Sequence, residues 1–329
     1  MLRLPPCEAR FPTSIAEAIE LKATHGLEAS YVAGGTDLYP NMKRRQQTPY
    51  HLIDIRRIPE LRRLEVDADG GLIIGAGVTL TQLIRDEHVA AGWPVLGQAA
   101  ATISTPILQN MGTVGGNLLL DTRCNYYDQS YEWRKAIDFC MKKDGEICWV
   151  APSSPRCWAV QSSDLVPVMI ALDATVTLTG PEGTRTIPTE ALYHNDGIDY
   201  LTKRRDELLV SVQVPAMGLA RATYQKLRRR GSFDFPVLGV AAWIRPNGGT
   251  TVGEARVVIG AVGSYPIVSE AAATVLVGHA LDDDTIDAAA RAAAKPAKPL
   301  DNTDFTIGWR KDMVAVYVRR ALKELRLGA

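Results

Sequence analysis

Residues 33–38 read Ala-Gly-Gly-Thr-Asp-Leu and follow a run at 28–32, Glu-Ala-Ser-Tyr-Val, that predicts a strand. Two adjacent glycines leave successive backbone N–H groups without a Cβ in front of them, and such a turn can bind a pyrophosphate. A second loop of this kind, Thr113-Val-Gly-Gly-Asn117, comes after an expected helix. Either loop alone is more often an ordinary tight turn. The two together, in neighbouring parts of the chain, indicate a two-sided phosphate site.

Other nucleotide motifs and nucleophile motifs are missing from the sequence. The segment at 75–80, Gly-Ala-Gly-Val-Thr-Leu, lacks the third glycine and the later acidic residue of a dinucleotide fingerprint. The chain has neither a Walker A sequence nor a G-x-S-x-G elbow. We therefore expect neither a Rossmann domain nor a P-loop, and we assign no catalytic residue to this chain.

Composition limits the class of protein further. The chain has 329 residues, 37 Lys and Arg against 37 Asp and Glu, and 46% apolar residues. This length favours two or three domains with a substantial core. A net charge of zero argues against nucleic acid or an anionic membrane as the partner. Because no apolar run approaches a bilayer span and the first residues lack a signal-peptide core, we expect a cytoplasmic protein.

Four cysteines lie close together in the sequence, whereas Cys7 stands apart as a free thiol. Cys124, Cys140, Cys148 and Cys157 are separated by 16, 8 and 9 residues, which is too far for the paired ligands of zinc knuckles. Residues 121–158 also hold 7 of the chain's 22 aromatic residues, and aromatic side chains shield metal clusters from water. An iron–sulfur site is slightly favoured on these grounds, while a zinc site and a metal-free loop stay open.

The order of elements predicts an α+β protein in three parts. Helices are expected after a capping box at 14–17, after Thr79, and at 95–107, 285–294 and 306–325. Strands are expected at 28–32, 51–55, 72–76, 166–180, 184–188, 207–215, 222–227, 237–244 and 255–262.

Two single residues have both an ordinary and a functional interpretation. Asp164 stands in Ser-Ser-Asp-Leu-Val-Pro before a β pattern, where turn capping is the commoner role and contact with a ligand the rarer one. Lys226 lies among several basic residues and is most simply a solvated strand edge.

Four segments in this order resemble the FAD-binding medium subunits of the molybdenum hydroxylases, the relatives of xanthine dehydrogenase. They are AGGTDL at 33–38, GTVGGN at 112–117, SDLVP at 163–167, and YQKLRRR with DFPVLGVA at 224–241. The resemblance covers essentially the whole chain. It implies a PCMH-type FAD-binding fold of two α+β subdomains, at 1–58 and 59–217, followed by a domain of three antiparallel strands with helices at 218–329.

The resemblance also implies where cofactors would bind. One side of the FAD pyrophosphate site would be formed by Gly34, Gly35, Thr36, Asp37 and Leu38, and the other by Thr113, Gly115, Gly116 and Asn117. Asp164 would contact the flavin end, with Ile103, Leu209 and Lys226 lining the site. The insert at about 121–158 resembles that of the 4-hydroxybenzoyl-CoA reductase β subunits, which implies a [4Fe-4S] cluster on Cys124, Cys140, Cys148 and Cys157.

The function implied by this resemblance is electron transfer within a larger enzyme. The partners would be a molybdopterin-binding large subunit and a small subunit with two [2Fe-2S] clusters, assembled as a dimer of heterotrimers. In the reductase, electrons would enter from ferredoxin at the [4Fe-4S] cluster and pass through FAD and the [2Fe-2S] centres to molybdenum, where 4-hydroxybenzoyl-CoA loses its hydroxyl. The alternatives are an oxidising molybdenum hydroxylase of another aromatic, heterocyclic or aldehyde substrate, and a zinc-stabilised adaptor that is not an enzyme.

Overall fold

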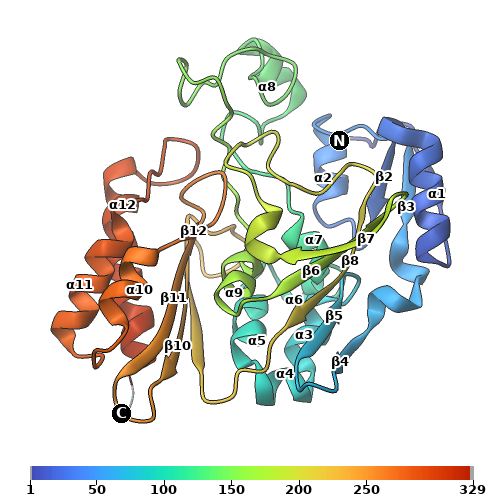
Figure 1. Ribbon diagram of the computed structural model, residues 1–329. Helices are drawn as coiled ribbons and strands as arrows, with labels where there is room; N and C mark the ends of the chain where they lie inside the picture. The colour runs from blue at the N-terminus through green and yellow to red at the C-terminus, as the bar shows by residue number, and fades with distance from the viewer. Residues whose placement is uncertain (1, 327–329) are drawn as a thin grey trace.

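The computed structural model describes residues 2–326 and shows three units, each with its own β-sheet (Figure 1). Helices and strands are mixed throughout, so the expected α+β class is confirmed. The N-terminal unit and the C-terminal unit lie on either side of the middle unit in this view.

The N-terminal unit contains a parallel sheet in the order β1-β3-β2. Its elements are β1 (Glu8–Arg10), α1 (Ile15–His25), β2 (Ala29–Val32), α2 (Leu38–Lys43) and β3 (His51–Asp54). Helix α1 begins as predicted, because the Ser14 hydroxyl accepts a hydrogen bond of 3.2 Å from the N–H of Glu17. The Glu17 carboxylate accepts from the N–H of Thr13 instead of closing the expected box on Ser14. Helix α2, which the sequence pattern did not predict, follows the first glycine loop directly.

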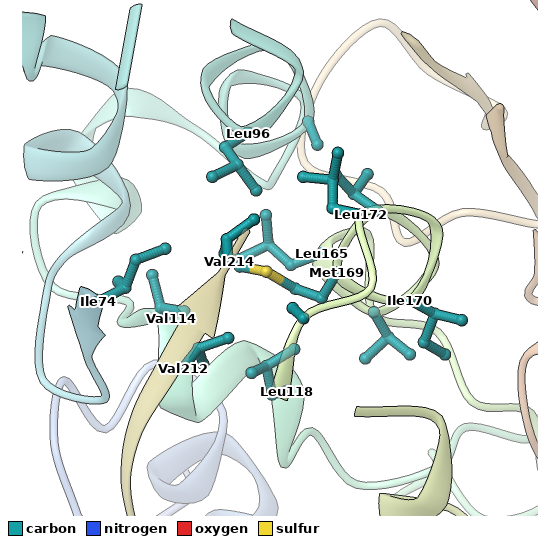
Figure 2. Close-up of a cluster of buried hydrophobic side chains, with 14 of the residues drawn as sticks. Ile74, Leu96, Val114, Leu118, Leu165, Met169, Ile170, Leu172, Val212 and Val214 are labelled. Carbon is teal, nitrogen blue, oxygen red and sulfur yellow. The ribbon is translucent and has the colours of Figure 1, made fainter. Parts of the chain in front are cut away.

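The middle unit contains an antiparallel sheet in the order β4-β5-β8-β6-β7, covered by short helices. Its elements are β4 (Leu64–Val66), β5 (Leu72–Gly75), α3 (Leu80–Arg85), α4 (Glu87–Gly92), α5 (Pro94–Ala101), α6 (Pro106–Gln109), α7 (Val114–Leu118), α9 (Leu165–Ala171), β6 (Thr175–Gly180), β7 (Gly183–Pro188) and β8 (Leu208–Val214). Figure 2 shows Val212 and Val214 of β8 beside Leu165 and Met169 of α9, with Leu96 of α5 close by. This shared core fixes the helices that carry the second glycine loop to the sheet.

Two predictions for this unit are wrong in detail. Residues 166–171, expected as the first part of a strand at 166–180, belong to helix α9, and all seven residues of this helix are buried. A run that is apolar on every side has no periodicity that separates a buried helix from a buried strand, and Pro167 is tolerated in the first turn of a helix. The helix expected at 95–107 is divided into α5 and α6, because Ser104 has a φ of +52° and Pro106 begins a new helix.

The insert between α7 and α9 projects at one end of the molecule and contains the short helix α8 (Tyr131–Ala136) (Figure 1). It is attached to the segment that follows α2. The guanidinium of Arg134 donates to the carbonyl of Arg44 at 2.9 Å, and the amide of Gln46 donates to the carbonyl of Tyr127 at 2.5 Å.

The C-terminal unit contains an antiparallel sheet in the order β12-β11-β10-β9. Its elements are β9 (Arg221–Leu227), β10 (Leu238–Pro246), β11 (Val252–Gly260), β12 (Ile267–Val268), α10 (Glu270–Leu276), α11 (Asp283–Ala294) and α12 (Ile307–Glu324). Helices α10 and α12 pack on this sheet, and α9 and α5 of the middle unit also contact its strands. Strand β12 and helix α10 exceed the three strands and two helices that were expected. The segment that holds them is short, and α10 depends on Ser269 as its N-terminal cap.

Within residues 2–326, no helix is both long enough and apolar enough to cross a bilayer.

Candidate functional site

A cavity of about 400 Å³ lies between the N-terminal unit and the middle unit. Its lining includes residues from the loop after β2, from the chain between α5 and α7, and from the segment that leads into β8. Both glycine loops line it, although about 80 residues separate them in the sequence. A cavity of this volume is typical of a small-molecule or cofactor site.

The first glycine loop has a backbone that only glycine permits. A Cβ on Gly34 would overlap the carbonyl oxygen of Met111, and Gly35 has a φ of +68° with the ring of Tyr39 against it. None of the N–H groups of residues 34–38 donates a hydrogen bond to another group of residues 2–326. Because unpaired N–H groups are costly when water is excluded, such a row beside a cavity favours an anionic ligand.

The second glycine loop uses its own N–H groups internally. The N–H of Gly115 donates to the carbonyl of Ala76 at 2.9 Å, and that of Gly116 donates to the hydroxyl of Thr113 at 3.1 Å. A Cβ on Gly115 would lie 2.6 Å from the Cβ of Ala76, so the loop needs glycine in order to pack against this residue, which directly follows β5. This loop therefore shapes the cavity and contributes few free backbone donors.

Asn117 has a role that the sequence did not indicate. Its Oδ1 accepts hydrogen bonds from the hydroxyl of Ser163 at 2.6 Å and from the N–H of Leu165 at 3.2 Å. Asn117 thus joins the second glycine loop to the start of α9. Within residues 2–326 its amide nitrogen has no partner and is available to a ligand in the cavity.

Most of the residues predicted for the FAD site line this one cavity. They are Gly34, Gly35, Thr36, Asp37, Leu38, Ile103, Thr113, Gly115, Gly116, Asn117 and Leu209. Asp37 also forms an ion pair with Arg123 of the insert and accepts a hydrogen bond of 2.9 Å from Asn41. Asp164 and Lys226 do not line the cavity.

Asp164 and Lys226 form a buried ion pair behind the cavity. The Lys226 ammonium lies 2.9 Å from Oδ2 of Asp164 and donates to the carbonyl of Thr102 at 3.0 Å. The hydroxyl of Tyr224 donates to Oδ1 of Asp164 at 2.8 Å. Burial raises the pKa of Asp164 and lowers the pKa of Lys226, and in each residue the charge of the other opposes the shift. The pair joins α9 to β9 and fixes Thr102, the residue that precedes Ile103. Asp164 is therefore not a turn cap, and Lys226 is not a solvated strand-edge residue.

Sequence reasoning missed the basic residues that line the cavity. Lys22, Lys203 and Arg205 all contribute to it. Burial lowers the pKa of Lys203 to about 8, although the carboxylate of Glu207 opposes this shift. In the sequence, Lys203-Arg204-Arg205 resembles any solvated charge cluster, and no motif distinguishes it.

The four clustered cysteines converge on a second, small cavity in the insert. Cys124, Cys140, Cys148 and Cys157 are all buried, all free of disulfides, and all line it. The remaining lining residues are Tyr126, Tyr127, Met141, Lys142, Trp149 and Val150. Within residues 2–326, no group of three or more His, Cys, Asp or Glu is arranged so that it could hold a metal ion.

The surroundings of Cys157 are tightly specified. The N–H of Ala159 donates to Sγ of Cys157 at 3.4 Å, and a Cβ on Gly197 would lie 2.6 Å from that sulfur. Burial raises the pKa of the Cys157 thiol to about 11, while the Ala159 N–H and the ammonium of Lys142 oppose the shift. The insert and the 197 region therefore meet at this sulfur.

Comparison with known families covers nearly the whole chain. Residues 7–217 match the FAD binding domain in molybdopterin dehydrogenase, and residues 222–325 match the CO dehydrogenase flavoprotein C-terminal domain. The carbon monoxide dehydrogenase medium chain of Hydrogenophaga pseudoflava is 30% identical over 97% of this chain and 96% of its own length. The FAD-binding subunit of an aldehyde oxidoreductase from Escherichia coli strain K12 is 36% identical over 74% of this chain and 78% of its own length.

Solved structures show the same relationship. A carbon monoxide dehydrogenase structure from Hydrogenophaga pseudoflava covers 98% of this chain and 97% of its own with a TM-score of 0.80 and 29% identity. A structure of the Cu,Mo-CO dehydrogenase covers 98% of both chains with a TM-score of 0.82 and 27% identity. The whole fold is therefore shared with these flavoproteins.

Proposed function

The chain belongs to the FAD-binding medium subunits of the molybdenum hydroxylase family, and we propose that it is an electron-transfer subunit that holds FAD and one [4Fe-4S] cluster. The observation that carries the FAD site is the row of unpaired N–H groups at 34–38, which lies beside a cavity of about 400 Å³. When bound, FAD exchanges electrons singly or in pairs, and a thiolate-ligated cluster exchanges them singly.

Different residues of the cavity would contact different parts of FAD. The N–H groups of residues 34–38 would hold the pyrophosphate, with positive charge added by Lys22, Lys203 and Arg205. Ile103 and Leu209 supply apolar surface for the ring system. The Asp164–Lys226 pair would act from behind, by fixing the backbone at Thr102 beside Ile103.

Our proposal of an iron–sulfur cluster rests on the chemistry of the four cysteines. A zinc ion needs its ligands at about 2.3 Å from one point, and no described group of ligands has such an arrangement. The thiolates of a cluster ligate different iron atoms, so they can lie around a larger core. Four buried free thiols, with Tyr126, Tyr127 and Trp149 around the same cavity, support Cys124, Cys140, Cys148 and Cys157 as the ligands. The zinc-stabilised adaptor has no comparable support.

The substrate of the complete enzyme would be transformed in another subunit. We propose that this chain works beside a molybdopterin-binding large subunit and a small subunit with two [2Fe-2S] clusters, in a dimer of heterotrimers. The insert favours 4-hydroxybenzoyl-CoA reductase, with ferredoxin as donor. The 36% identity to an aldehyde oxidoreductase subunit favours oxidation of an aldehyde as the second candidate.

Two measurements test this proposal. The purified chain should show a flavin absorbance band and about four iron atoms per chain, whereas the adaptor would show zinc and no flavin. The complex that co-purifies with the chain should then be assayed with 4-hydroxybenzoyl-CoA and a low-potential donor, and separately with aldehydes and an electron acceptor. Turnover of aldehydes alone would reject the reductase, and a chain with neither flavin nor iron would reject the whole proposal.

A further inference from the structure

A buried ion pair lies between the two cavities described above. We call the cavity of about 400 Å³ the large cavity, and the small cavity lined by the four clustered cysteines the cysteine cavity. Asp121 lines the large cavity, and Lys142 lines the cysteine cavity. The ammonium of Lys142 lies 2.9 Å from Oδ1 of Asp121, and the exposed fractions of the two side chains are 6% and 8%. Each charged group therefore borders one cavity while contacting the group that borders the other.

The hydrogen bonds around this pair are numerous. Lys142 also donates to the hydroxyl of Thr122 at 2.7 Å and to the carbonyl of Gly197 at 2.6 Å. Oδ2 of Asp121 accepts from the amide of Gln47 and from the hydroxyl of Tyr127, both at 3.0 Å. Gln47 lines the large cavity and Tyr127 lines the cysteine cavity, so the network is continuous from one to the other.

Two aromatic rings hold the ammonium in place. The Nζ atom of Lys142 lies 4.8 Å from the ring centroid of Tyr127 and 5.4 Å from that of Tyr200, which lines the large cavity. Rings at these distances attract a cation. The position of this positive charge is thus fixed by three hydrogen-bond acceptors and two rings.

A pair buried in this way is weak evidence for stability, because removing both charges from water offsets most of their attraction. Its place between two cavities suggests another role. Gly197, whose carbonyl accepts from Lys142, also packs against Sγ of Cys157. The ammonium therefore lies close to the sulfur of Cys157, in surroundings where charges are poorly screened.

We propose that Lys142 and Asp121 are positioning residues that set, in opposite directions, the reduction potential of the redox group held by the four cysteines. This inference rests on the proposed function, because it requires that group to be bound. If a [4Fe-4S] cluster is bound there, uptake of one electron from a one-electron donor such as dithionite would convert one Fe³⁺ to Fe²⁺, with no bond made or broken, and would add one negative charge. Lys142 favours the added charge and Asp121 opposes it.

The test compares four variants of the full chain. Lys142→Met removes the positive charge, Asp121→Asn removes the negative charge, and the double variant removes both. Lys142→Arg keeps the positive charge and is the matched control. Each is titrated with dithionite, and the reduced cluster is followed by its EPR signal, while iron content and thermal melting show whether the chain is loaded and folded.

The expected shifts have opposite signs. At the wild-type midpoint potential, Lys142→Met should lower the ratio of reduced to oxidised cluster about tenfold, which is a 59 mV shift for a one-electron couple. Asp121→Asn should raise the ratio about tenfold, and the double variant and Lys142→Arg should stay within about threefold of wild type. General disruption of packing would not give opposite signs in the two single variants.

Loaded single variants that shift in the same direction, or not at all, would overturn the inference while leaving the proposed function intact. If Lys142→Met alone fails to fold, the inference is still tested by two results. These are the direction in which Asp121→Asn shifts the reduction potential, and the recovery of the wild-type potential in the double variant. A wild-type chain that binds FAD and contains no iron would overturn both the cluster and this inference, and the iron analysis distinguishes that case.

Discussion

Replacing Gly34 with alanine tests whether the first glycine loop binds the FAD pyrophosphate. The new Cβ would overlap the carbonyl oxygen of Met111, which belongs to the segment that leads into the second glycine loop. Real Cβ atoms essentially never approach another heavy atom within 3.0 Å, so the loop and Met111 must separate by about 1 Å or more. A shift of that size lengthens a hydrogen bond of about 2.9 Å beyond the distance at which it contributes.

The expected loss follows from the number of N–H groups that move. Hydrogen bonds to charged groups contribute about 1.5–3 kcal/mol each. If two of the N–H groups at 34–38 leave the phosphate, binding weakens by about 3–6 kcal/mol, which is about 10²- to 10⁴-fold in Kd. The Gly34→Ala variant should therefore be purified largely without flavin.

The assay titrates the flavin-free chain with FAD and follows the quenching of flavin fluorescence. Gly97→Ala is the matched control, because Gly97 lies in α5 and its added Cβ would meet only the Cα of Ile84 at 4.0 Å. Gly97→Ala should bind FAD as wild type does and be up to about 1 kcal/mol more stable. A folded Gly34→Ala chain that binds FAD within about threefold of wild type would refute the assignment of the phosphate site.

Three further predictions concern charges and ligands. Burial lowers the pKa of Lys203 to about 8, so its positive charge is present below that pH and lost above it. FAD affinity, measured by fluorescence titration, should therefore fall as the pH rises through 8, and the Lys203→Met variant should lack this pH dependence. Lys226→Met should reduce the free energy of unfolding in urea by about 3–5 kcal/mol, because it leaves the carboxylate of Asp164 buried without its partner. Adding Asp164→Asn to this variant should recover much of the lost free energy. Cys140→Ser should abolish the EPR signal of the cluster and leave flavin absorbance unchanged, whereas loss of FAD alone would contradict the separation of the two sites.

Much of the site could be predicted because its residues are required by the local backbone conformation and local packing. The glycines of the two loops are required by backbone geometry and close packing, and such positions are visible in a sequence as Gly-Gly pairs after a strand or a helix. The capping box of Thr79 and Gln82 is equally local, and it occurs as expected. By contrast, the prediction of a strand is wrong at 166–171, because a segment buried on every side carries no periodicity.

The sequence by itself determined the α+β class, the family, the two glycine loops and the cluster of four cysteines, since each depends on residue type and spacing along the chain. Only the tertiary structure decided which charges meet. The Lys226–Asp164 pair joins residues 62 positions apart, and Lys142 and Asp121 are paired across the insert. Such contacts arise when separate elements pack into one core and exclude water. The sequence contains the charged residues, but only folding gives each one its partner and its burial.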